Sequence, residues 1–187
     1  MIFDDILLVF NGEIYNYKEL IHLEQLECKT KSDSEVLIRL YQKYGFNFLN
    51  KLNGMFAFCI YDIKKELYFC ARDRYGKKPF FYYFKNNKFI FFSSLKSILN
   101  LLDSKPNLNK VALCKYMQYF VPFGEDTFYQ DVFKLEASTY MIYEPNKPQE
   151  LQKKKYYKIN TYKAVKDEKQ ALNDIEELLV KSVEYRL

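Results

Sequence analysis

Two pairs of aromatic-rich runs of strand length constrain most how this chain can fold. Met55 to Tyr61 and Leu67 to Ala71 alternate with a period of two and are joined by a short polar segment. Phe80 to Phe84 and Phe89 to Phe92 repeat this pattern around Asn86-Asn87. The chain holds 18 tyrosines and 17 phenylalanines, and such strands favour sheets buried on one face and partly covered on the other. We therefore expect hairpins within a layered domain of helices and sheets.

The remaining elements follow from apolar spacing and from helix start and stop signals. Ile6 to Phe10 is an apolar run that predicts a buried strand halted by a turn at Asn11-Gly12. Ser32 to Glu35 has the form of a capping box, so the Ser32 hydroxyl and the Glu35 carboxylate are expected to bind backbone N–H groups at the start of a helix that ends at Gly45. Further helices are expected at residues 16–26, 95–102, 110–120 and 167–187, with a strand at 139–143 and a turn at 145–148.

Composition excludes several classes of protein. The 187 residues are 49% hydrophobic and 28% charged, as in a folded domain, and no stretch approaches the roughly 18 apolar residues of a membrane helix. We expect a cytoplasmic protein with no membrane partner. The four cysteines show no metal-type spacing, and His22 is the single histidine, so we expect no metal site. Arginine supplies four of the 29 basic residues, which argues against a nucleic-acid partner despite the net charge of +5.

Four ordered motifs point to one family. They are VFNGEIYNY at 9–17, SDSEVL at 32–37, LNGMFAF at 52–58 and ARDRYGKKPFFY at 71–82. Together they resemble the glutaminase half of glutamine-hydrolysing asparagine synthetases, which is a class II glutamine amidotransferase domain of the N-terminal nucleophile hydrolase superfamily. The resemblance implies an α+β fold, a layered α/β/β/α sandwich with largely antiparallel sheets, here incomplete.

The same resemblance implies the site residues. Asn11 and Gly12 would form the oxyanion hole for the tetrahedral intermediate, the first through its side-chain amide and the second through its backbone N–H. Asn11, Gly12, Glu13 and Asp33 would bind glutamine, with Asp33 and the backbone of Glu13 holding its α-amino group. Each has a plainer interpretation, since Asn-Gly is a common turn and an acid in a first helical turn stabilises the helix dipole. Arg72, Asp73 and Arg74 are interpreted as structural ion pairs that orient the site.

The sequence also departs from the family pattern. The family's nucleophile is a cysteine directly after the initiator methionine, whereas this chain begins Met1-Ile2, and Cys28 has no free α-amino group to act as its base. We therefore assign no nucleophile. The chain stops short of an SGGxDSS-type phosphate loop, so it is expected to hold no cofactor, and ATP and magnesium are expected only in a missing synthetase domain.

The expected organisation and function follow. Residues 1–104 are interpreted as a partial type 2 glutamine amidotransferase domain, 105–163 as its end and a connecting segment, and 164–187 as the first helix of an asparagine synthetase domain. The chain is expected to be a fragment, inactive alone, of an enzyme that releases ammonia from glutamine for ATP-dependent amidation of aspartate. Its partners would be glutamine and either a separately encoded synthetase domain or a second copy of itself. The alternatives are another class II amidotransferase, or a noncatalytic glutamine-binding remnant or regulatory module.

Overall fold

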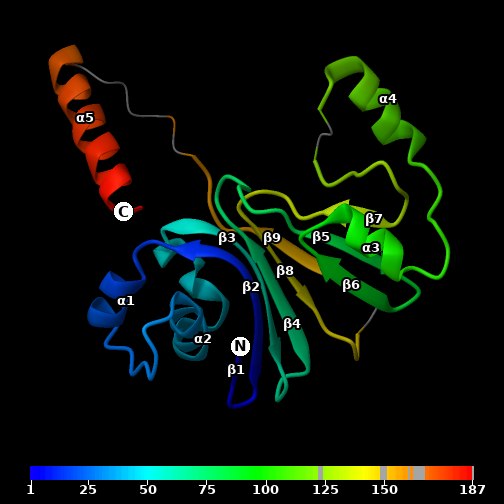
Figure 1. Cartoon of the computed structure of the whole chain (residues 1–187), viewed down its shortest axis with the longest axis horizontal. Helices are drawn as coiled ribbons and strands as arrows, with labels where there is room; N and C mark the ends of the chain where they lie inside the picture. Colours follow the sequence, from blue (N-terminus) through cyan, green and yellow to red (C-terminus); the bar gives the residue numbers. More distant parts are fainter. Residues whose placement is uncertain (122–123, 148–150, 160, 162–166, 187) are drawn as a thin grey trace.

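The computed structural model describes residues 1–121, 124–147, 151–159, 161 and 167–186, and its elements form four layers (Figure 1). Two helices, α1 (Tyr17–Leu23) and α2 (Asp33–Tyr44), cover one face of a large sheet. A smaller sheet lies against the opposite face, and α3 (Leu95–Leu101) contacts its outer side. This arrangement is the α/β/β/α sandwich that the sequence predicts.

The large sheet has six antiparallel strands in the order β1-β2-β3-β4-β8-β9. Its strands are β1 (Ile2–Phe3), β2 (Ile6–Ile14), β3 (Gly54–Asp62), β4 (Leu67–Arg72), β8 (Thr139–Tyr143) and β9 (Leu151–Lys155). The β3–β4 hairpin and β8 are confirmed as predicted. The short β1 pairs with β2 only at Ile6 and Leu7, so β1 does not cover the remainder of that edge of β2, from Leu8 to Ile14.

The small sheet has three antiparallel strands in the order β6-β5-β7. They are β5 (Phe81–Lys85), β6 (Lys88–Phe92) and β7 (Val132–Lys134). Asn86 and Asn87 have positive φ angles of 49° and 60°, as a tight turn between β5 and β6 requires, which confirms the second hairpin. The helix α4 (Lys110–Tyr119) begins at Asn109, whose side chain accepts from Ala112 N.

Two apolar cores hold the layers together. The first lies between the large sheet and its helices, and its buried members include Leu8, Leu37, Leu40, Phe58 and Phe69. The second lies between the two sheets, and its buried members are Ala57, Cys59, Cys70, Phe80, Tyr82, Leu135 and Met141. Successive residues of a strand project to opposite faces, so β3 and β4 serve both cores at once.

The start of α2 differs from a capping box in one respect. Ser32 is the N-cap and accepts from Ser34 N, and the helix ends at Gly45 with a φ of 59°, as predicted. The Glu35 carboxylate, however, accepts from Lys29 N, Thr30 N and the Thr30 hydroxyl rather than from the N-cap residue. Glu35 is fully buried, so it fixes the loop before α2 instead of closing the first turn.

Several expectations need correction. β2 does not end at Asn11-Gly12 but runs through this pair to Ile14, because both residues stay in register with β3. The strands β1, β7 and β9 and the 3₁₀ helix η1 (Gly45–Lys51) are absent from the sequence prediction. The lysines of β9 are exposed, and Lys153 Nζ also donates to the buried Tyr82 hydroxyl at 3.1 Å. Of the turn expected at 145–148, residue 148 lies outside the described residues.

The helix α5 (Glu168–Glu184) lies apart from the sandwich in Figure 1. Its predicted apolar face is confirmed, and the face is exposed: Leu172, Ile175, Leu178, Leu179 and Val183 are each 54–66% exposed. Its end contacts the sandwich, since the Tyr185 hydroxyl lies 3.4 Å from Glu19 Oε2. Residue 187 lies outside the described residues. In the part of the chain that the structure describes, no helix has the length and hydropathy to cross a membrane.

The Glu35 contacts give a stability prediction. Burial raises the pKa of Glu35, but the hydrogen bonds from Thr30 and Lys29 and the charge of Arg39 outweigh it, so the pKa lies below its usual value. Such a carboxylate stabilises the fold above its unfolded pKa, and this stability is lost as the pH falls through the lower folded pKa. Glu35→Gln should therefore lower the free energy of unfolding by about 2 kcal/mol at neutral pH, and less in acid.

Urea unfolding from neutral pH down to about pH 3 measures this difference. Glu177→Gln, on the exposed surface of α5, is the matched control and should change little. If Glu35→Gln lowered the free energy of unfolding by the same amount at every pH, the ionised Glu35 carboxylate would not be what stabilises the loop before α2.

Candidate active site

The central feature of the site is the last third of β2. In the β2–β3 ladder Tyr15 N donates to Asn53 O, and hydrogen-bonded and non-hydrogen-bonded pairs alternate along an antiparallel ladder. Counting back from this bond places Gly12 and Ile14 in non-hydrogen-bonded pairs with β3. Their N–H groups therefore point away from β3, toward the outer edge of β2.

Gly12 is required by close approach to β3. It has a φ of 151°, and a Cβ atom at this position would lie 2.1 Å from Met55 O and 2.7 Å from Phe56 Cα. No side chain fits at those distances. Glycine here keeps β2 paired with β3 and leaves an N–H donor on the outer edge.

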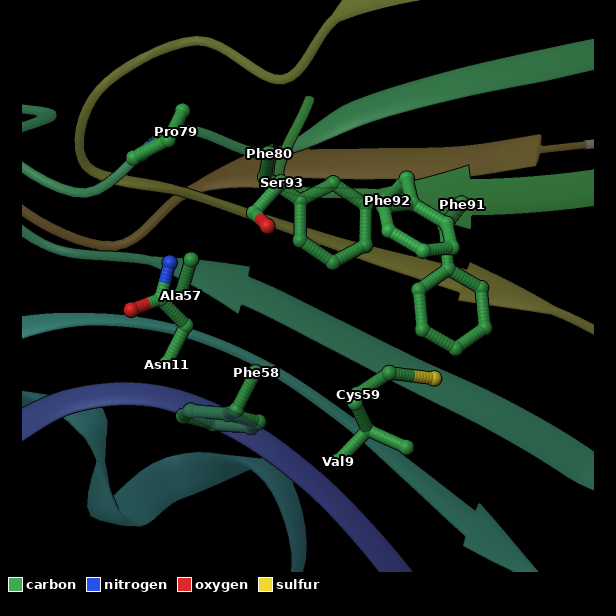
Figure 2. Close-up of a pocket in the computed structure, with 10 residues that line it drawn as sticks. All are labelled: Val9, Asn11, Ala57, Phe58, Cys59, Pro79, Phe80, Phe91, Phe92 and Ser93. Atoms are coloured by element: carbon green, nitrogen blue, oxygen red, sulfur yellow. The ribbon is translucent and has the colours of Figure 1, made fainter. Parts of the chain in front are cut away.

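Asn11 faces the space between the two sheets. Its side chain points from β2 into a cavity of about 320 Å³, shown in Figure 2. The lining residues are Val9, Asn11, Ala57, Phe58, Cys59, Pro79, Phe80, Phe91, Phe92 and Ser93. Most of them are apolar, so the Asn11 amide and the Ser93 hydroxyl are the polar side chains that a bound molecule would meet there. Asn11 itself is exposed, so a bound molecule would have to exclude water before this donor gained strength from the apolar lining.

Asp33 reaches the same edge of β2 from the start of α2. Its Oδ2 atom accepts from Ile14 N at 3.1 Å, and its Oδ1 atom lies 3.4 Å from the Ser34 hydroxyl. Asp33 is partly exposed, and Glu13, next to Ile14, is exposed. The fold thus brings together the predicted residues Asn11, Gly12, Glu13 and Asp33 although 19 residues separate Asp33 from Ile14.

The segment after β4 fixes the position of β3 and was only partly understood from the sequence. Asp73 is 1% exposed and accepts from four backbone N–H groups, of Phe56, Tyr75, Lys77 and Lys78, at 3.0–3.2 Å. A single carboxylate therefore ties the 73–78 loop to the residue opposite Gly12. An aspartate three residues before Gly76, whose φ is 63°, is the turn signal that could have indicated this role.

The arginines beside Asp73 also bind backbone groups, which corrects the ion-pair interpretation. Arg72 donates to Lys78 O, Leu135 O and Gly76 O at 2.6–2.7 Å, and burial lowers its pKa. Arg74 donates to Asn50 O at 2.9 Å and lies 4.8 Å from the centroid of the Tyr157 ring. Among the described residues no salt bridge joins Arg72, Asp73 or Arg74 to one another.

The cysteines lie in different environments. Cys59 lines the cavity, whereas Cys70 is fully buried beside it and Cys114 is exposed on α4. Cys28 packs at the helical core, and burial raises the pKa of its thiol. At neutral pH a smaller fraction of such a thiol is in the nucleophilic thiolate form.

In the residues that the structure describes, no three histidine, cysteine or acidic side chains gather where a metal ion could bind.

The chain matches the family of glutamine amidotransferase domains. The family model for that domain matches residues 3–157, most of the chain, so the chain belongs to the glutamine amidotransferase domain family. The chain is 44% identical over 186 residues to a Methanocaldococcus jannaschii protein named as glutamine-hydrolysing asparagine synthetase 2, covering 98% of this chain and 36% of that protein. It is 34% identical over 182 residues to Bacillus subtilis asparagine synthetase 1, covering 94% of this chain and 28% of that enzyme. The chain therefore spans about a third of the length of these relatives.

A solved structure shows the same fold. Glutamine phosphoribosylpyrophosphate amidotransferase from B. subtilis, complexed with ADP and GMP, superposes with a TM-score of 0.54 over 82% of this chain and 30% of that one. The two sequences are 17% identical, so the likeness concerns the fold alone. It confirms the layered sandwich of helices and antiparallel sheets.

The close contact at Gly12 gives a prediction. Gly12→Ala should lower the free energy of unfolding by about 3 kcal/mol, because β2 has to move away from Met55 O to admit the methyl group. Gly45→Ala is the matched control: Gly45 also has a positive φ, but its Cβ would meet no atom within 4 Å. The control should cost about 1 kcal/mol. Urea unfolding of both variants measures the difference, and equal losses would contradict the contact.

The hydrogen bonds to Asp73 give a further stability prediction. Asp73→Asn should lower the free energy of unfolding by about 3 kcal/mol. The new NH₂ group would replace a carboxylate oxygen that now accepts hydrogen bonds from backbone N–H groups, and those groups would lose their acceptor. Asp103→Asn, at a side chain that is 96% exposed, controls for the loss of one negative charge. Denaturant unfolding is again the measurement, and a loss no larger than that of the control would show that the carboxylate does not organise the loop.

Proposed function

We propose that this chain is the glutamine-binding part of a glutamine-hydrolysing asparagine synthetase. One observation carries the proposal: Asp33 Oδ2 accepts from Ile14 N at 3.1 Å, which holds its carboxylate on the edge of β2 to which the Gly12 N–H also points. An anion and an oxyanion donor therefore lie two residues apart on one strand edge. A glutamine molecule has a cationic α-amino group at one end and an amide carbonyl at the other, and it matches this pair.

The proposed roles follow from the chemistry of amide hydrolysis. Attack on the glutamine side-chain amide places negative charge on its oxygen, and the Asn11 amide and the Gly12 N–H would stabilise that charge. The Asp33 carboxylate and the backbone of Glu13 would hold the α-amino group. The cavity beside Asn11 would keep the reacting amide in apolar surroundings, where such donors act more strongly.

The proposal includes that this chain alone does not hydrolyse glutamine. Its four cysteines lie in the loop between α1 and α2, in the cavity wall, in the core between the sheets and on α4. In the described residues none of them hydrogen-bonds to a basic side chain that could take its proton, which an activated thiol needs. The nucleophile would come from a segment outside these residues.

The rest of the reaction is assigned by similarity to relatives about three times longer. We propose that residues 1–104 and 105–163 belong to the glutaminase part and its connection, and that 164–187 begin a synthetase domain. ATP, magnesium and the acceptor, aspartate, would bind in that domain, encoded in the same protein or separately. We also propose a cytoplasmic location, which four free cysteines support.

Calorimetric titration of the chain with glutamine tests the binding proposal. Asp33→Asn should weaken glutamine binding by on the order of tenfold or more, since the amide keeps an acceptor for Ile14 N but loses the charge that attracts the α-amino group. Asp103→Asn should bind as the unchanged chain does. Equal affinity for Asp33→Asn and the unchanged chain, with both folded by circular dichroism, would contradict the assignment of Asp33.

Ammonia release from glutamine tests the inactivity proposal separately. We expect no release above the uncatalysed rate for the unchanged chain. Release that disappears in Cys59→Ser would identify the cavity cysteine as a nucleophile and overturn the proposal. Failure to bind glutamine at all would reject the glutamine-binding function as a whole.

A further inference from the structure

Cys59 and Cys70 are directly opposite residues of the β3–β4 hairpin. Asp73 N donates to Phe56 O, so Phe56 and Asp73 form a hydrogen-bonded pair that continues the register of the β3–β4 hairpin. Hydrogen-bonded and non-hydrogen-bonded pairs alternate from there along the hairpin. Three steps along, Cys59 and Cys70 form a non-hydrogen-bonded pair. In such pairs the Cα atoms are about 4.5 Å apart and the side chains are at their closest.

This spacing suits a disulfide bond. Disulfides join residues whose Cα atoms lie roughly 4.4–6.8 Å apart, so the pair needs little backbone movement. Both side chains project to the same face, into the core between the sheets, where Cys59 is 2% exposed and Cys70 is fully buried. Burial and hydrogen bonding with Cys59 raise the pKa of Cys70 well above its usual value, so Cys70 is held as a neutral thiol.

Access differs between the two thiols. Cys59 lines the cavity between the sheets, and in Figure 2 its sulfur lies between Val9 and the aromatic rings of β6. Two other residues that line this cavity, Val9 and Phe92, are 60% and 45% exposed, so its lining is partly open to solvent. Cys70 does not line it. A small oxidant can therefore reach Cys59, and Cys70 lies directly behind it.

We propose that Cys59 and Cys70 are a modification site, a dithiol that hydroperoxides convert to an intramolecular disulfide. With hydrogen peroxide, the Cys59 sulfur attacks one oxygen, the O–O bond breaks, and the leaving hydroxide takes up the Cys59 thiol proton to form water. Cys59 is then a sulfenic acid. The Cys70 sulfur attacks the Cys59 sulfur, the S–O bond breaks, and a second water leaves with the Cys70 proton. Two thiols are oxidised and one peroxide is reduced. This inference is independent of glutamine binding.

The site has a structural consequence. Asn11 pairs with Ala57, two residues before Cys59 on β3, and all three residues line the cavity. The disulfide would cross-link β3 to β4 in the same wall of the cavity to which Asn11 belongs. Oxidation would thus change the wall of the proposed site without touching the residues assigned to glutamine.

Peptide mapping tests the proposal on the full chain carrying Cys28→Ser and Cys114→Ser, so that only the pair remains. The folded protein is treated with hydrogen peroxide, its free thiols are alkylated, and it is digested with trypsin without reduction. Cleavage at Lys51, Lys64, Lys65 and Arg72 separates Cys59, in residues 52–64, from Cys70, in residues 66–72. We expect these two peptides joined in one molecule and separated by dithiothreitol.

Two further variants in the same background define each thiol's role. Cys70→Ser should leave Cys59 as a sulfenic acid that dimedone traps, and Cys59→Ser should leave Cys70 unmodified in the folded protein. Both thiols recovered as alkylated cysteines after peroxide treatment would overturn the proposal. So would Cys59 oxidised to a sulfinic acid with Cys70 free, or a cross-link that forms in urea but not in the folded chain.

Discussion

The pairing of β2 with β3 is the constraint on which the site depends. Nine residues of β2 stay in register with β3, including Asn11 and Gly12, which on sequence grounds alone should form a turn. Strand pairing overrides the turn tendency because Gly12 has no Cβ atom to meet Met55 O. Continuing the strand places the Asn11 side chain in the cavity between the sheets and directs the Gly12 N–H to the outer edge of β2.

Three carboxylates position both sides of this pairing. Asp33 binds the backbone of β2, Asp73 binds the backbone of β3, and Glu35 binds the loop that delivers α2 to the sheet. Each accepts backbone N–H groups that strand or helix pairing leaves free, and hydrogen bonds to a charged acceptor are stronger than those between neutral groups. Asp33 differs from the other two in being partly exposed. It is thus the one of the three with room for a ligand beside its structural bond.

Much of the fold could be predicted from the sequence because its signals are local. The two hairpins, the Ser32 start of α2 and the helix at 168–184 follow from spacing, turn residues and caps. β9 could not be predicted, because its lysines are those of an exposed edge strand and its pairing partner is β8. The site residues Asn11, Gly12, Glu13 and Asp33 were named by resemblance, but their convergence depends on a hydrogen bond across 19 residues that no local pattern contains. Asp73 was misinterpreted for the same reason, since its partners are backbone groups.

Two of the apolar surfaces that the described chain leaves open differ in origin. The cavity beside Asn11 lies within residues 3–157, which match the amidotransferase family, and small polar and apolar groups line it together. The exposed face of α5 lies beyond that match and presents five aliphatic side chains from one side of a helix. A contiguous aliphatic helix face is typical of a packing surface rather than of a ligand site. If the proposed function holds, the first surface serves the chemistry of glutamine, and the second serves the contact with the synthetase part that uses the ammonia.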